Sequence, residues 1–291
     1  ICRDLIFFHI SNEVQAGELT GGIQATGNYP GAARNIDELR ADIVKAKSYI
    51  PGTHRLNLHE IYGDFKGKVV DRDEVTPEYF ESWIEWAKEN NMKLDFNSTS
   101  FSHPKSGNLS LANPDEGIRN FWIEHTKRCR EISEAMGKAQ GDPCIMNLWV
   151  HDGSKDQTVN KYLYRSLLKD SLDKIFATKY DNMKDCIESK VFGIGLESFT
   201  VGSNDFYTAY AAQNNKLITL DTGHFHPTES VADKVSAMLL YVPELMLHVS
   251  RPIRWDSDHV TIMDDPTLDL FQEIVRAGAL DRAQNSYSQA Y

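Results

Sequence analysis

The chain has 291 residues, of which 41% are hydrophobic and 25% are charged, and this composition excludes disorder as the default state. Its 42 acidic and 31 basic residues give a net charge of −11 at pH 7, and no basic stripe offsets that charge, which argues against a nucleic-acid partner. No apolar run approaches the length of about 20 residues that a membrane span needs, so we expect no membrane partner either.

Strand and helix patterns alternate along the chain. We expect a first strand at Arg55–Leu58 and then a helix that opens at Thr76-Pro77, because threonine can cap a helix and proline fits its first turn. Apolar residues at i, i+3, i+4 and i+7 support this helix, which Asn90 ends. The later elements that we expect, in chain order, are strand Lys93–Phe96, helix Pro114–Met136, strand Cys144–Val150, helix Tyr162–Phe176, strands Val191–Leu196 and Leu217–Leu220, helix Glu229–Leu240, strand Leu245–Val249 and helix Pro266–Ala277.

This alternation of buried strands with helices predicts a parallel α/β sheet. About six strand–helix units fit most of an eight-fold (β/α)8 barrel of the TIM type, or a large doubly wound sheet. No linker or internal repeat divides the sequence, so we expect a single domain over residues 1–291.

The four cysteines show neither a CxxC pair nor zinc-finger spacing. The N-terminus has no signal-peptide pattern. Together these features favour buried thiols in a reducing compartment, and hence a cytoplasmic location. The sequence begins at Ile1 rather than methionine, so we expect a fragment or a processed piece.

Polar side chains follow several of the predicted strands. The carboxyl ends of parallel strands point at one shared face, where the active sites of such folds are built. Asp221 and His224 are separated by a turn that contains Gly223, which lets both side chains reach one ion. The other polar or aromatic residues near predicted strand ends are His103, Trp149, Glu188, Lys190, His248, Asp256 and Asp258.

Carboxylates and imidazoles without cysteine indicate a site for a divalent cation, in the range from Mg²⁺ and Mn²⁺ to Co²⁺ and Zn²⁺. Asp256 and Asp258 point the same way in an extended segment, and a bound cation would relieve their repulsion. Each residue also has a plainer interpretation. A lone histidine or Trp149 fits the core, Lys190 fits a surface ion pair, and the two aspartates fit a loop of Asx turns.

Five segments carry a resemblance to a known family, namely HRLNLHEIY, DFN with FSHP, ESKVFGIGLES, LDTGHFHPTE and LLYVPELMLHVSRPIRWDSDHV. In these segments the sequence resembles L-rhamnose isomerases. The similarity runs from about Thr20–Gly31 to the end of the predicted helix near Ala277, and the pair GHFHPTE and HVSRPIRWDSDH is its most specific part.

The resemblance implies a (β/α)8 barrel that assembles as a homotetramer and interconverts a small sugar, L-rhamnose, with L-rhamnulose. It implies two divalent ions per subunit, Mn²⁺ or another cation such as Zn²⁺, Co²⁺ or Mg²⁺. The implied ligands are Glu188, Asp221 and His248 for one ion, and His224, Asp256 and Asp258 for the other.

The resemblance also implies the residues that act on the sugar. Lys190 would contact a substrate oxygen, and Asp256 or Asp258 would steer a water bound at the second ion. Trp149 would form a wall of the sugar pocket, and His103 would contact the far end of the sugar.

Residues 1–18 and 278–291 do not match the pattern of the family. Members of the family have a further strand with an aspartate after the helix that ends here near Ala277. We therefore expect the barrel to be either complete or without its first and last strands. Two alternatives to the isomerase stay open from the sequence: a metal-dependent hydrolase on the same barrel, and an inactive truncated fragment that keeps the ligands in an unfinished site.

Overall fold

The computed structural model describes residues 5–9, 33, 35–101, 103–156, 158–190, 198–253 and 259–288, with the backbone alone at 5–9 and 284–288. Six strands form a curled parallel sheet with the order β9-β8-β6-β4-β3-β2. Along the chain these strands are β2 (Thr53–His59), β3 (Met92–Ser98), β4 (Cys144–Trp149), β6 (Met183–Glu188), β8 (Leu217–Asp221) and β9 (Leu245–Val249).

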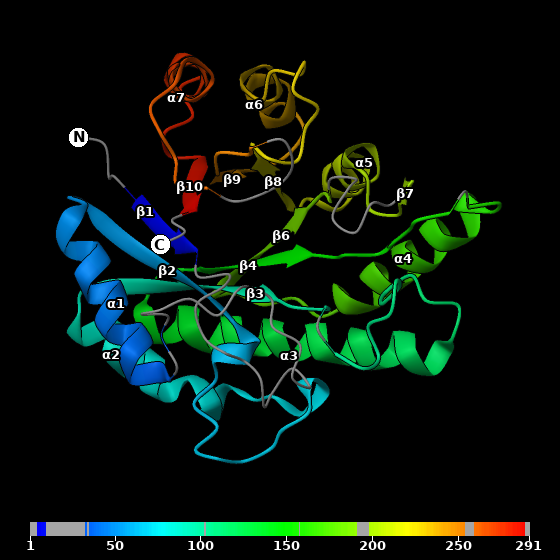
Figure 1. Ribbon diagram of the computed structural model, residues 1–291, viewed down its shortest axis with the longest axis horizontal. Coiled ribbons are helices and arrows are strands. Elements are labelled where there is room, and N and C mark those ends of the chain that lie inside the picture. The colour runs from blue at the N-terminus through cyan, green and yellow to red at the C-terminus, as the bar shows by residue number, and fades with distance from the viewer. Residues whose placement is uncertain are drawn as a thin grey trace.

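Two further strands close this sheet through their backbones. Strand β1 (Leu5–His9) pairs in parallel with β2 and with β10 (Ala283–Ser288), and β10 pairs with β9, so the eight strands form a ring. Figure 1 shows β1 and β10 side by side in the upper left part of the view, below α7. Neither strand is predicted from the sequence: AQNSYS in β10 lacks the apolar run of a buried strand, whereas LIFFH in β1 is such a run and was overlooked.

Helices connect successive strands on the outside of the sheet. In the described part of the chain they are α1 (Ile36–Tyr49), α2 (Glu81–Glu89), α3 (Glu116–Gln140), α4 (Lys161–Ile175), α5 (Asn204–Asn214), α6 (Ala232–Leu239) and α7 (Asp265–Arg276). Helices α1 to α3 lie on one side of the strands and α6 and α7 on the other (Figure 1). Short 3-10 turns η1 (Glu60–Tyr62), η2 (Arg72–Glu74) and η3 (Pro77–Phe80) follow β2, and the short strands β5 (Gly153–Ser154) and β7 (Phe199–Thr200) pair antiparallel.

Alternate residues of each strand face the helices or the inside of the ring. The outward-facing residues, such as Leu94, Met146 and Leu247, belong to the main hydrophobic core beneath the helices. A separate buried cluster of Ile145, Cys186, Leu217 and Met246 fills the inside at the level where these strands begin. The positions that follow on the same inward face are polar, and they build the site described below.

Most of the predicted elements are confirmed; apart from the unpredicted strands β1, β5, β7 and β10, there are three differences. Thr76 makes no side-chain cap, and the segment after it is the 3-10 turn η3, with α2 beginning only at Glu81. The helices α1 and α5 were missed. The sequence prediction also placed a strand at Val191–Leu196, which lies outside the described residues, whereas the strand that joins the sheet in this region is β6.

Strand β6 was not predicted, because a charged residue interrupts its apolar residues. In MKDCIE the outward-facing Asp185 is buried, and it is tolerated there because Arg130 of α3 and Lys216 pair with it at 2.7 Å and 2.6 Å. Buried charges are stable when they are paired in this way.

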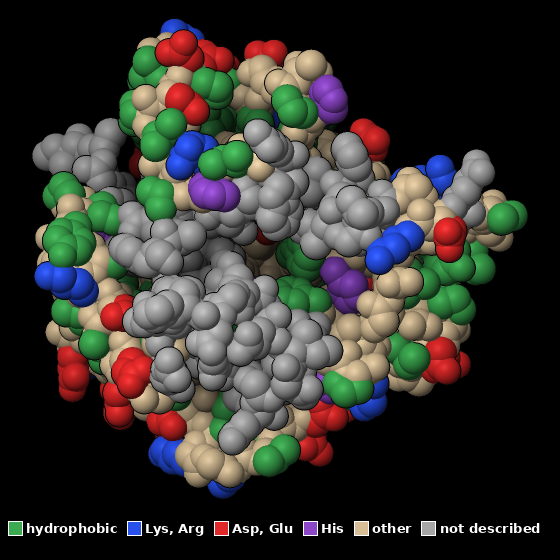
Figure 2. Space-filling model, in the orientation of Figure 1, with side chains coloured by type: hydrophobic (Ala, Val, Ile, Leu, Met, Phe, Trp, Pro, Cys, Tyr) green, Lys and Arg blue, Asp and Glu red, His purple; other side chains and the backbone are tan. Residues whose placement is uncertain are grey.

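The described surface carries mixed charge. Figure 2 shows acidic and basic side chains interspersed around the edge of the face in view. Within the described ranges, no helix is long and apolar enough to span a bilayer.

Candidate metal centre

Three buried ligand-type side chains meet at the carboxyl ends of adjacent strands. Glu188 ends β6, Asp221 ends β8, and His248 lies in β9 opposite Asp221 in the pairing register. Each offers one ligand atom within 4.8 Å of the others. We call this group the carboxyl-end cluster. Its members are at most 8% exposed, so they meet inside the ring rather than on the surface.

The two carboxylates of the carboxyl-end cluster are held in the same manner. Asp221 Oδ1 accepts a hydrogen bond from the backbone N–H of Gly223 at 2.6 Å, and Glu188 Oε2 accepts one from Asn147 Nδ2. The other oxygen of each carboxylate faces imidazole nitrogen. Asp221 Oδ2 lies 2.5 Å from His248 Nδ1, and Glu188 Oε1 lies 3.6 Å from the same atom.

His224 adds a second imidazole to this place. Its Nδ1 lies 3.5 Å from Glu188 Oε1, and its Nε2 lies 3.4 Å from Asp221 Oδ2. The turn that brings it there is closed by a hydrogen bond from its backbone N–H to the Asp221 carbonyl, as the sequence predicts. Gly223 allows this turn without a positive φ, so the backbone freedom of glycine is not what the turn requires.

This donor set fits a divalent cation. Two carboxylates brought together inside a protein repel one another, and a cation between their inward oxygens would relieve that repulsion. Oxygen and imidazole nitrogen are the ligands of Mn²⁺, Co²⁺ and Zn²⁺ sites, whereas Mg²⁺ prefers oxygen alone. The predicted partners Asp256 and Asp258 of a second ion lie outside the described residues.

Two predicted substrate residues adjoin Glu188, one through strand pairing and one along the chain. Trp149 ends β4 and is the register neighbour of Glu188 in β6, with its ring edge-on to Phe101 at 5.7 Å. Lys190 follows β6 and is 4% exposed, and its Nζ donates to the carbonyl of His151 at 2.8 Å. Trp149 is thus the strand neighbour of Glu188, and Lys190 stands two residues after Glu188 in the chain.

His103 lies in a different neighbourhood. Its Nε2 lies 3.0 Å from Asp71 Oδ1, its Nδ1 accepts the backbone N–H of Lys105, and its ring stacks on Phe121 at 5.0 Å. Burial lowers the pKa of His103, although Asp71 opposes that shift. Its ring also meets Trp122, which in turn contacts His125.

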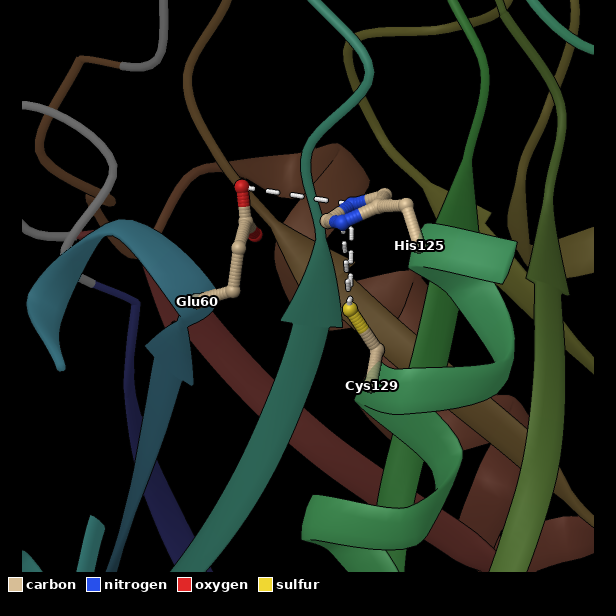
Figure 3. A group of neighbouring side chains, drawn as sticks. All are labelled: Glu60, His125 and Cys129. Carbon is tan, nitrogen blue, oxygen red and sulfur yellow. Dashed lines mark hydrogen bonds and ion pairs between the residues drawn. The ribbon is translucent and has the colours of Figure 1, made fainter. Parts of the chain in front are cut away.

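A second buried group lies between η1 and helix α3, and consists of Glu60, His125 and Cys129 (Figure 3). We call it the helix-side cluster. His125 Nε2 lies 4.0 Å from Glu60 Oε1 and 3.7 Å from Cys129 Sγ. His125 Nδ1 lies 3.0 Å from the carbonyl of Arg72, which can only accept, so Nδ1 carries the proton.

The charge balance of the helix-side cluster differs from that of the carboxyl-end cluster. Arg72 Nη1 lies 3.5 Å from Glu60 Oε1 and supplies a cation next to the single carboxylate. Burial raises the pKa of Glu60 to about 7 and lowers that of His125 to about 3, and it raises that of the Cys129 thiol. A neutral imidazole, a neutral thiol and a guanidinium do not favour a metal ion, so we assign this group a structural role.

The sequence prediction missed the residues behind Glu188. Asn147 and Thr219 are polar residues within the apolar runs CIMNLW and LITLD, and that interruption was the available signal. It also gave no role to His125, although His125 and Cys129 stand four residues apart on a predicted helix and thus on one face.

Comparisons with known proteins identify the relatives of this chain. A family model described as L-rhamnose isomerase (RhaA) matches residues 9–287. The L-rhamnose isomerase of Bacteroides thetaiotaomicron is 84% identical over 270 residues, which cover 93% of this chain and 65% of that protein. The one from Rhodopirellula baltica is 54% identical over 269 residues, which cover 91% and 63%. The chain therefore spans slightly less than two thirds of the length of these relatives.

Solved structures share the fold at low sequence identity. A D-tagatose 3-epimerase-like protein superposes with a TM-score of 0.59 at 12% identity, over 84% of each chain. The structure of SacUVDE superposes with a TM-score of 0.52 at 11% identity, over 97% of this chain and 91% of the other. At such identities the likeness concerns the fold alone.

Proposed function

This chain belongs to the L-rhamnose isomerase family, and on that premise we propose that the protein interconverts L-rhamnose and L-rhamnulose with a divalent metal ion. The observation that carries the proposal is the carboxyl-end cluster. Glu188, Asp221 and His248 come from three neighbouring strands and converge where this type of fold places its active site.

The proposal assigns the cluster to a first ion, with Mn²⁺ as the favoured cation. His224, Asp256 and Asp258 would hold a second ion. A cation at such a site stabilises the negative charge that develops on the sugar oxygens when hydrogen moves between C1 and C2. Asp256 or Asp258 would steer a water that takes the proton from the O2 hydroxyl while a proton is delivered to O1, so that the C2 alcohol becomes the ketone and the C1 aldehyde becomes an alcohol.

Lys190 is proposed to hold a sugar oxygen. The carbonyl of His151 takes one of the three ammonium hydrogens and fixes the direction of the side chain. A second ammonium hydrogen would then be directed at O1 or O2, where its positive charge favours the transition state over the ground state. Trp149 would form the adjacent wall, since it is the register neighbour of Glu188. His103 would reach the far end of the sugar once its hydrogen bond to Asp71 gives way.

The proposal extends to the whole assembly. We propose a complete (β/α)8 barrel in a single domain, a homotetramer and a cytoplasmic location. The closed ring of strands supports the barrel. The buried free thiols of Cys129, Cys144 and Cys186 support the cytoplasmic location. Sedimentation of the purified protein measures the oligomeric state.

The decisive experiment is to strip the purified chain with a chelator, add Mn²⁺ and measure the ketose formed from L-rhamnose. We expect ketose only in the presence of the metal. Lys190→Met should abolish turnover while Mn²⁺ binding persists. Lys184→Met is the matched control, because Lys184 lies at the other end of β6 and pairs with Glu244. A well-folded chain that binds Mn²⁺ and forms no ketose contradicts the proposal, and a product of altered mass would indicate the hydrolase.

Asp256→Asn tests the proton-transfer role. We expect this variant to fold like the wild type and to lose activity, because a neutral amide cannot take a proton from the water that the carboxylate would steer. Wild-type turnover in Asp256→Asn would remove that residue from the mechanism.

A further inference from the structure

A chain of three buried polar side chains lies behind Glu188 on the inner face of the sheet. Asn147 is in β4, Thr219 is in β8, and Cys186 is in β6 two residues before Glu188. All three are at most 4% exposed. Cys186 belongs to the apolar cluster at the start of the strands, and Asn147 and Thr219 lie between that cluster and the carboxyl-end cluster at the end of the strands.

The donors and acceptors of this chain have a fixed direction. Thr219 Oγ1 donates to Asn147 Oδ1 at 2.8 Å, which leaves the amide Nδ2 to donate to Glu188 Oε2. The threonine hydroxyl has one proton and donates it to Asn147. In the contact of 3.0 Å between Cys186 Sγ and Thr219 Oγ1 the thiol is therefore the donor and the hydroxyl oxygen the acceptor. Thr219 therefore determines which way the Asn147 amide is turned.

The amide in turn determines which carboxylate oxygen is presented to the cluster. Glu188 has three rotatable side-chain bonds and two chemically equal oxygens. Asn147 binds Oε2, and Oε1 is the oxygen that lies 3.5 Å from His224 Nδ1 and 3.6 Å from His248 Nδ1. An amide turned the other way would place its oxygen against the carboxylate, and two acceptors would repel.

From this geometry we infer that Asn147 is a positioning residue that directs Glu188 Oε1 toward the metal site, and that Thr219 holds Asn147 in the orientation that this requires. The inference rests on the proposed function, since it assigns Glu188 to the metal. Partners of this kind behind a ligand typically change metal affinity by about 10–100-fold when they are removed.

The test is the Mn²⁺ affinity of the purified chain, measured from the electron paramagnetic resonance signal of free Mn²⁺. We expect Asn147→Ala to weaken binding by about 10–100-fold. Thr219→Val keeps the shape of the side chain and removes the hydroxyl, and it should weaken binding in the same direction but less. Thr219→Ser restores the donor and should bind as the wild type does. Met246→Leu is the matched control, because Met246 is the register neighbour of Thr219 with an apolar side chain.

Thermal unfolding of the metal-free variants separates positioning from packing. A positioning role weakens Mn²⁺ binding in Thr219→Val more than in Met246→Leu at a similar metal-free Tm. Unchanged affinity in Asn147→Ala, or a loss in Met246→Leu as large as in Thr219→Val, overturns the inference while the proposed function stands. A wild-type chain that takes up no Mn²⁺ overturns both.

Discussion

The carboxyl-end cluster and the helix-side cluster resemble each other in spacing and differ in charge. Each brings one ligand atom from each of three buried side chains to within 4.8 Å. The first joins two carboxylates with one imidazole, and His224 lies next to it. The second has one carboxylate with Arg72 at 3.5 Å, so its cation is already part of the protein. The comparison teaches that ligand spacing alone does not define a metal site, because the net charge of the surrounding side chains decides whether a cation is favoured.

The largest expected effect comes from removing the built-in cation. Arg72→Met should lower the free energy of unfolding by about 3–5 kcal/mol, because it strips a buried carboxylate of its partner. It also leaves the carbonyls of Thr99 and Phe101 without their donor. Urea unfolding at neutral pH measures the change. The control is Arg128→Met on helix α3, whose ion pairs are partly exposed to solvent and contribute less than about 1 kcal/mol. Equal losses in both variants would contradict the difference in role.

Metal binding separates the two clusters directly. Asp221→Asn should reduce Mn²⁺ affinity by at least roughly 100-fold, which corresponds to about 2.7 kcal/mol, since it removes a ligand charge in place. Glu60→Gln should leave the affinity unchanged. Isothermal titration calorimetry with Mn²⁺ measures both. If Glu60→Gln weakened binding as strongly as Asp221→Asn, the assignment of the metal to the carboxyl-end cluster would be wrong.

The pH dependence of stability tests the electrostatics of the helix-side cluster. The pKa of Glu60 is raised from 4.5 to about 7. Between these two pH values the folded state holds more protons than the unfolded state, so stability falls as pH rises from 4.5 to about 7. The pKa of His125 is lowered to about 3, so stability falls as pH drops below 6.5. Each slope is at most about 1.4 kcal/mol per pH unit, and the two oppose one another between pH 4.5 and 6.5.

Single substitutions should separate the two opposing contributions to the pH dependence of stability. In Glu60→Gln the contribution of His125 remains, so stability should fall from pH 6.5 to 4.5. In His125→Asn the contribution of Glu60 remains, so stability should rise over the same range. Urea unfolding at several pH values measures each slope relative to the wild type. Parallel curves for the wild type and both variants would show that neither pKa is shifted by burial.

The smallest effect is expected at the thiol. Cys129→Ser should cost about 1 kcal/mol of folding free energy, because a hydroxyl is more costly to bury than a thiol and its shorter C–O bond reaches less far toward His125 Nε2, which lies 3.7 Å from the sulfur. Mn²⁺ binding should not change. A loss of metal affinity on this substitution would mean that the helix-side cluster, and not only the carboxyl-end cluster, takes up the ion.

Much of the fold was predictable because most strands are short apolar runs that can be recognised from the local sequence. LITLD and LMLHV are apolar runs with a ligand-type residue at the last or the last but one position, and both lie where the sequence places them. Strand β6 was not predictable in this way. Its outward-facing Asp185 is stabilised by Arg130, which stands 55 residues away, and no local pattern carries that information.

The amino-acid sequence by itself determined the alternation of strands and helices and the chemistry available at the strand ends, because both depend on residues that are close along the chain. Only the tertiary structure decided that Glu188 turns Oε1 toward the imidazoles, and that Glu60 is matched by Arg72 rather than by a metal. These outcomes depend on partners such as Asn147, which lies 41 residues from Glu188 and meets it only because β4 and β6 pair in one register.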